Sequence, residues 1–219
     1  MSVGGALRAA LADTYHQSWR LVLLNAALSA AVVPLLVAAL WVPVALVVAI
    51  LVAGPLALAL MHCAVTLAQT EELSLRCWPA GVRLLWRRGL VLGLLVGVVV
   101  VAGIVAVEAY ARADAWPLAA LVLYVLAAFV ALQLVLWPLA VSEPRAPLRS
   151  VLRSAATVFF QRPLELAALA AALAAVNLVG AAAALMPFLT LTVAYSFLAA
   201  AHFTLPRPPI REAESSWPV

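Results

Sequence analysis

The sequence predicts an all-α membrane protein with six transmembrane helices, and two observations lead to this fold class. The 219 residues are 68% hydrophobic and only 10% charged, with a mean hydropathy of +1.15, whereas a soluble globular domain is about 45–50% apolar and about 25% charged. The apolar residues form continuous runs rather than the alternation of a membrane β-barrel. We therefore expect residues 1–205 to form a single transmembrane domain.

The first long apolar run divides into two helices. No charged residue lies from Leu21 to Ala68, which is about twice the roughly 20 residues that one span needs. Pro43 supplies the turn, because a proline at the start of a helix loses no backbone hydrogen bond. The other runs are each about one span long. The six predicted spans cover residues 20–41, 43–68, 89–107, 117–141, 163–185 and 187–205, and residues 206–219 form a short, extended cytoplasmic tail.

The arginines predict the orientation, because Lys and Arg accumulate in cytoplasmic loops. The chain has no lysine, and a cytoplasmic amino terminus places 12 of the 13 arginines inside. Only Arg112 falls outside, beside Glu108 and Asp114. We therefore expect a multi-pass protein of the bacterial cytoplasmic membrane, with both termini in the cytoplasm.

Two series of residues recur along the chain at spacings of about 70. The spacings are 74 and 70 for the prolines and 68 and 74 for the arginines. We interpret the chain as three consecutive units, each an amphipathic elbow followed by a helical hairpin, although prolines at helix starts are common enough for a chance match. Because each unit crosses the membrane twice, the copies point the same way, which predicts a pseudo-threefold bundle. The prolines are Pro43, Pro117 and Pro187, and the arginines are Arg20, Arg88 and Arg162.

Each predicted elbow carries apolar residues at helical spacing. Such helices lie in the interface with their basic residues toward anionic headgroups. The apolar stripes are Val3, Leu7, Leu11 and Tyr15, then Leu75, Trp78, Val82 and Leu85, then Leu148, Leu152, Ala155 and Phe159. The predicted headgroup contacts are Arg76, Arg83, Arg87, Arg145, Arg149 and Arg153.

A few polar residues lie within the spans, mostly toward the cytoplasm. Asn25, His62, Gln133 and His202 are the candidates for a shallow polar pocket. For the two histidines, the more common role is packing or a position at the membrane interface. Two histidines without a carboxylate or a third ligand do not predict a metal site. We expect Gln133 and Asn177, which lie deeper, to form interhelical hydrogen bonds.

Two further features have structural interpretations. Gly89, Gly93 and Gly97 place small residues along one helix face, which suits either an internal contact or a partner surface. Cys63 and Cys77 lack metal-ligand spacing and fall where thiols stay reduced, so we expect them to be inert.

No motif predicts catalysis. The sequence contains no Gly-rich phosphate loop, nucleophile elbow or helical His-Glu-x-x-His motif, so we expect neither an enzyme nor a bound cofactor. Membrane orientation explains the basic charge, which gives no reason to expect nucleic-acid binding.

The order of features resembles the YesL-type family of small bacterial membrane proteins across most of the chain. The resemblance rests on the segment from Trp19 to Asn25, the Gly54-Pro55 stretch, the segment from Trp78 to Arg88, and the loop from Glu143 to Arg149. Members are often encoded beside carbohydrate importers of the ATP-binding-cassette type, which implies an accessory role. We therefore expect an accessory or assembly protein that associates with the permease subunits of such an importer. The alternative is a small transporter or channel that uses the polar pocket.

Overall fold

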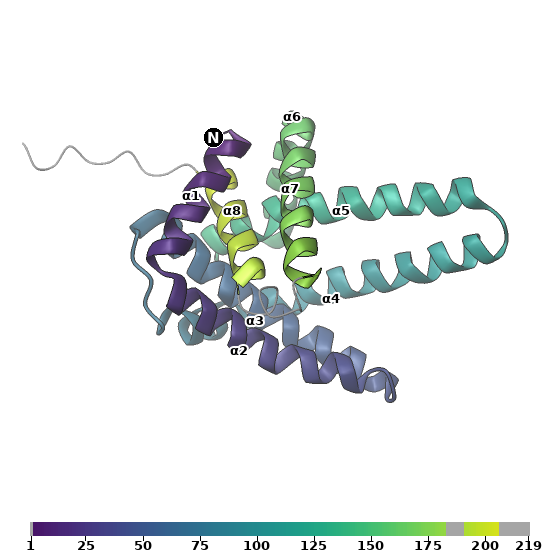
Figure 1. The fold of residues 1–219 in the computed structure, drawn as a ribbon, viewed down its shortest axis with the longest axis horizontal. Helices are drawn as coiled ribbons and strands as arrows, with labels where there is room; N and C mark the ends of the chain where they lie inside the picture. The colour runs from purple at the N-terminus through teal and green to yellow at the C-terminus, as the bar shows by residue number, and fades with distance from the viewer. Residues whose placement is uncertain (1, 183–190, 206–219) are drawn as a thin grey trace, which may run out of the picture.

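The computed structural model of the chain describes residues 2–182 and 191–205, which fold into α-helices connected by short loops (Figure 1). Within these two ranges there are eight helices and no β-strand. The helices are α1 (Val3–His16), α2 (Ser18–Ala38), α3 (Pro43–Thr70), α4 (Cys77–Arg112), α5 (Trp116–Ser142), α6 (Leu148–Gln161), α7 (Pro163–Ala182) and α8 (Val193–Thr204).

Five of the described helices, α2, α3, α4, α5 and α7, are long and apolar enough to cross a membrane. They coincide with the first five predicted spans, which confirms the prediction of an all-α, multi-pass membrane protein. The sixth predicted span, residues 187–205, contains the shorter apolar helix α8. Its first residues lie in the segment 183–190, outside the described residues, as does the predicted tail.

Prolines begin helices where the sequence predicts them. Pro43 is the first residue of α3, and Pro117 is the second residue of α5. Both positions lack an intrahelical acceptor for the backbone N–H, so proline costs nothing there. Pro187, the third member of the series, lies outside the described residues.

The second predicted elbow is not a separate helix. Its residues form the first turns of α4, which continues without interruption for 36 residues. The first and third elbows do form the separate helices α1 and α6. Pro163 explains the break after α6, because proline keeps the preceding residue out of the α region and Arg162 accordingly has φ −135° and ψ 51°. No proline follows Arg88, so nothing breaks α4 there.

The long helices form two hairpins that extend to the same side of the molecule (Figure 1). The α2–α3 hairpin and the α4–α5 hairpin share the α3–α4 interface, whereas α7 runs across α5 rather than alongside it. Because part of the third unit lies outside the described residues, the pseudo-threefold bundle stays a prediction.

Glycines bring α3 and α4 into backbone contact. A Cβ built on Gly93 would lie 2.5 Å from Gly54 Cα, and one built on Gly89 would lie 2.5 Å from Pro55 Cα. A Cβ on Gly97 would instead meet the side chain of Ile50. The stripe of small residues that left two interpretations open is therefore an internal contact, in which the absence of side chains lets the helices approach closely.

Candidate functional site

The face of α1 that packs on the protein is the alanine face. Ala6 and Ala10 are fully buried, whereas Leu11 and Tyr15 of the predicted apolar stripe are 63% and 81% exposed. The prediction that the apolar stripe of this elbow sinks into the membrane interface stays a prediction, because Leu11 and Tyr15 are exposed and remain available to lipid. Alanine gives the closest approach to a neighbouring helix, and α8 occupies that side. Leu11 and Tyr15 point away from the protein, whereas Val3 and Leu7 are partly buried against the core.

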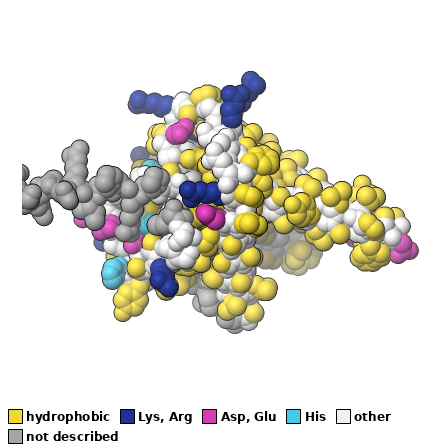
Figure 2. All heavy atoms as spheres, turned by 90° about the horizontal axis from the view of Figure 1, so that it is seen from above, with side chains coloured by type: hydrophobic (Ala, Val, Ile, Leu, Met, Phe, Trp, Pro, Cys, Tyr) yellow, Lys and Arg dark blue, Asp and Glu magenta, His cyan; other side chains and the backbone are white. Residues whose placement is uncertain are grey.

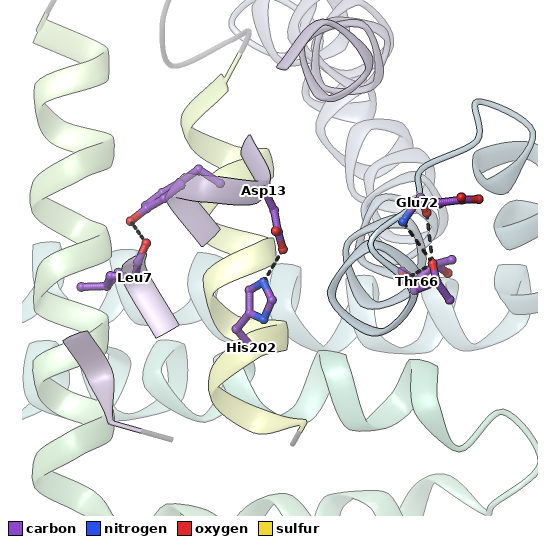
Figure 3. Close-up of polar contacts among 7 residues, drawn as sticks. Leu7, Asp13, Thr66, Glu72 and His202 are labelled. Atoms are coloured by element: carbon purple, nitrogen blue, oxygen red, sulfur yellow. Dashed lines mark hydrogen bonds and ion pairs between the residues drawn. The ribbon is translucent and has the colours of Figure 1, made fainter. Parts of the chain in front are cut away.

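His202 contacts the carboxylate of Asp13 on α1, a partner that the sequence does not predict. Its Nε2 lies 2.7 Å from Asp13 Oδ2, and the two side chains are only 1% and 13% exposed. Figure 3 shows Asp13 of α1 pointing toward His202 of α8. The hydroxyl of Tyr195, one further residue of α8, donates to the carbonyl of Leu7 at 3.2 Å. Polar contacts therefore fasten the amino-terminal helix to the last described one.

The deeper amides divide into one interhelical and one local contact. Asn177 of α7 donates to Ser196 Oγ of α8 at 2.8 Å, which confirms the predicted interhelical bond. Gln133 differs from its prediction, because its Oε1 accepts from the indole of Trp137 on the same helix at 2.9 Å. Its Nε2 has no partner among the described residues.

His62 lies where α3 meets the start of α4. A Cβ built on Gly81 would be 3.0 Å from His62 Cδ2 and 3.2 Å from Ala59 Cα, so the α4 backbone passes directly over this part of α3. Thr66, one turn further along α3, has its hydroxyl oxygen 3.7 Å from the Cys77 sulfur. The structure therefore places His62 beside a thiol, a neighbourhood that sequence spacing does not reveal.

The four residues of the predicted polar pocket have different neighbourhoods. His62 lies at the α3–α4 interface and His202 at the α1–α8 interface. Gln133 contacts Trp137 of α5, whose ring lies beside Phe197 of α8. Asn25 is fully buried within α2. Three surface grooves, one between α5 and α7, one along α3 and α4 and one on α6, include none of the four. A single pocket that contains all four stays a prediction.

Two arginines of the repeat series bind backbone carbonyls of distant loops. Arg88 donates to the carbonyls of Ala140 at 2.9 Å and Glu143 at 2.7 Å, and also to that of Ala146. It thus satisfies the orphan carbonyls at the carboxyl end of α5 and in the following loop. Arg20 similarly donates to the carbonyl of Leu73, in the loop after α3. In both cases the arginine that opens a hairpin holds the chain just beyond that hairpin's second helix.

The third arginine of the series has a different partner. Arg162 lies 3.5 Å from Glu165 on the first turn of α7. The carboxylate is also favoured there by the helix dipole. The chain beyond the end of the third hairpin, residues 206–219, lies outside the described residues.

The predicted headgroup arginines all lie on the surface. Arg83 and Arg87 lie on the exposed side of α4, and Arg149 and Arg153 lie on the exposed side of α6. Arg76 and Arg145 are exposed just before these two helices. Their exposure leaves the guanidinium groups available to anionic lipid, and contact with lipid stays a prediction. The six are Arg76, Arg83, Arg87, Arg145, Arg149 and Arg153.

A lateral apolar groove runs between α5 and α7. Its volume is about 560 Å³, and its lining is apolar apart from the hydroxyl of Tyr124. On α7 the lining side chains are all small and recur at helical spacing. They are Pro163, Ala167, Ala170, Ala171 and Ala174.

The outer part of the α4–α5 hairpin lies apart from the other helices. Figure 1 shows it projecting beyond them, and Figure 2 shows apolar side chains along its length with acidic side chains at its far end. The exposed apolar residues occur on several faces of both helices, which is the pattern of a surface that hydrocarbon or other apolar helices cover. They include Val98, Val101, Ile104, Val105, Leu121, Leu123, Tyr124 and Val125.

The chain matches no protein-family model, no curated protein and no solved structure. Two features stand out: the lateral groove between α5 and α7, and the polar ties at the predicted cytoplasmic ends of the helices.

Proposed function

We propose that this chain is a membrane-embedded accessory or assembly protein that binds another membrane protein laterally, through the groove between α5 and α7. The observation that carries this proposal is the shape and lining of that groove. It holds about 560 Å³ and is lined on α7 by small residues at helical spacing. Helices associate in lipid by close backbone approach at small residues. A groove of this composition therefore suits a transmembrane helix of a partner.

The projecting α4–α5 hairpin supports the same proposal. A hairpin with few neighbours of its own presents a long apolar surface to a partner lying beside it (Figure 1). Binding through such a surface needs no catalytic group, cofactor or metal. We propose the permease subunits of a carbohydrate importer as the partner, and this choice rests on the resemblance to the YesL-type family.

Photo-crosslinking in native membranes tests the proposal. A photoreactive phenylalanine analogue at Ala171, in the groove, is expected to give a covalent adduct with another membrane protein. The same analogue at Val44, an exposed apolar position at the outer end of α3, serves as the matched control. Mass spectrometry of the Ala171 adduct is expected to identify a permease subunit. Equal yields of protein adduct at the two positions would contradict lateral binding through the groove.

A small transporter is the second candidate, and the buried Asp13–His202 contact favours it. A carboxylate and an imidazole 2.7 Å apart form a pair that can exchange a proton near the end of a helix bundle. For this candidate, purified protein in liposomes should carry a measurable flux that is lost on replacing His62 or His202. Flux unchanged by both replacements would exclude the predicted polar pocket as its route.

A further inference from the structure

The two cysteines of the chain face each other across the α3–α4 interface. Gly81 of α4 lies over Ala59 of α3, where a Cβ on Gly81 would be 3.2 Å from Ala59 Cα. The two helices are antiparallel, so one turn back along α4 corresponds to one turn forward along α3. That step takes Gly81 to Cys77 and Ala59 to Cys63.

A contact between the two helices agrees with this register. The Cys77 sulfur lies 3.7 Å from the hydroxyl oxygen of Thr66, which follows Cys63 on the same face of α3. Cys63 is fully buried, whereas Cys77 is partly exposed. A small oxidant can therefore reach Cys77, and the buried thiol of Cys63 lies next to it.

We propose that Cys63 and Cys77 are a redox-sensitive pair that forms a reversible disulfide on exposure to hydrogen peroxide. Both thiols are free in the structure, which thus represents the reduced form. Disulfides in reducing compartments are generally transient and redox-sensing. Redox-sensing cysteines are accessible thiols placed next to a resolving cysteine, and Cys77 and Cys63 have these two roles.

The chemistry balances in two steps. Cys77 passes its proton to His62, and its sulfur attacks one peroxide oxygen. The O–O bond breaks, and the departing hydroxide takes that proton to form water, which leaves a sulfenic acid on Cys77. The Cys63 sulfur then attacks the Cys77 sulfur, the S–OH bond breaks, and the hydroxide leaves as water with the Cys63 proton. Each sulfur loses one electron, peroxide gains two, and a cellular dithiol returns two electrons to reverse the bond.

The bond would join the end of α3 to the start of α4 and close the loop between them. That loop contains Leu73, whose carbonyl accepts from Arg20 of α2. Oxidation therefore fixes the position of three helices at the side that the arginines predict to be cytoplasmic. A redox signal in the cytosol would reach the membrane-spanning part of the protein by this route.

Counting free thiols in membranes tests the proposal. Because the chain has only two cysteines, an intramolecular disulfide can only be this one. Membranes are treated with hydrogen peroxide, denatured, and labelled with a maleimide carrying a polyethylene glycol mass tag. We expect two tags before oxidation, none after it, and two again after dithiothreitol. Two tags that persist through oxidation, or loss of tags only as a covalent dimer on a non-reducing gel, would overturn the proposal.

Three variants separate resolution by Cys63 from general reactivity. In Cys63→Ala, peroxide should convert Cys77 to a sulfenic acid that dimedone labels, without an intramolecular disulfide. In Cys77→Ala, the buried Cys63 should react with peroxide much more slowly. Moving the resolving thiol by one residue, in Cys63→Ala with Ala64→Cys, rotates it about the helix and should abolish the disulfide while both thiols remain. A disulfide that forms as fast in this moved variant would show that the register is irrelevant and refute the inference.

Discussion

Adding one methyl group at the α3–α4 interface is expected to lower the stability by different amounts at glycines that look equivalent in the sequence. In Gly93→Ala the new Cβ would lie 2.5 Å from Gly54 Cα, about 0.9 Å short of the 3.4 Å at which ordinary contact begins. Both groups belong to helix backbones, so relief requires that the two helices move apart along their most extensive contact. Overpacking of a well-packed core costs about 1–3 kcal/mol. We expect Gly93→Ala to fall at the upper end of that range.

Two other glycines provide matched controls. At Gly97 the three atoms nearest the added Cβ all belong to the side chain of Ile50, which can shift more easily than a helix backbone, so Gly97→Ala should fall at the lower end of that range, about 1 kcal/mol. At Gly4 of α1 nothing lies within 4 Å. Because alanine loses less conformational entropy than glycine in a helix, Gly4→Ala should stabilise by about 0.5–1 kcal/mol.

The assay is unfolding of the purified protein in mild detergent with increasing sodium dodecyl sulfate, followed by tryptophan fluorescence. The expected order of unfolding free energies runs from Gly4→Ala as the most stable through Gly97→Ala to Gly93→Ala as the least stable. Equal losses in Gly93→Ala and Gly97→Ala would show that a Cβ added opposite the Gly54 backbone costs no more than one added opposite the Ile50 side chain. That result would refute the backbone contact between α3 and α4.

Three further predictions concern the polar contacts and the topology. Arg88→Gln should lower the free energy of unfolding by about 1.5–3 kcal/mol, because it removes charged hydrogen bonds to carbonyls at the end of α5, while Arg83→Gln on the exposed face of α4 should leave the same unfolding curve unchanged. Asp13→Asn should lower the free energy of unfolding by about 1–3 kcal/mol, because it weakens the contact with buried His202. Trypsin should then release the amino-terminal helix faster. An Asp13→Asn protein that resists trypsin as well as the parent would show that this contact does not hold α1 in place. In a chain whose two native cysteines are alanine, Arg149→Cys should react with a membrane-impermeant maleimide only after the cells are permeabilised, and labelling in intact cells would reverse the predicted orientation.

The hydrophobic pattern predicts the helices because hydrocarbon offers the backbone no alternative hydrogen-bond partner. Each of the first five predicted spans corresponds to a helix, and Pro43 and Pro117 begin helices as expected. The same pattern does not predict whether an elbow is a separate helix or the first part of the transmembrane helix that follows it. The stretch before Arg88 looks like the other elbows, yet it continues into α4, where nothing corresponds to Pro163 after α6 or to the break at Gln17 after α1.

Candidate sites were predicted less completely, because they depend on which helices meet. The sequence marks Arg20 and Arg88 by their spacing, and the structure adds that each donates to a backbone carbonyl just beyond the end of its own hairpin. It also marks His202 as polar, but the partner, Asp13, lies 189 positions away on an amphipathic helix. The two cysteines look unrelated at their spacing in the sequence, although they meet across α3 and α4.

By itself the sequence determines that this chain forms apolar helices for a membrane, and where most of them begin and end, because those properties follow from local composition and local backbone chemistry. The tertiary structure alone decides that Gly93 packs on Gly54, that Arg88 holds the end of α5 and that Cys63 faces Cys77. Apolar residues cover nearly every face of these helices, so the sequence gives little information about which face meets a neighbour. The choice depends on close packing of small residues and on a few polar groups that find partners far along the chain.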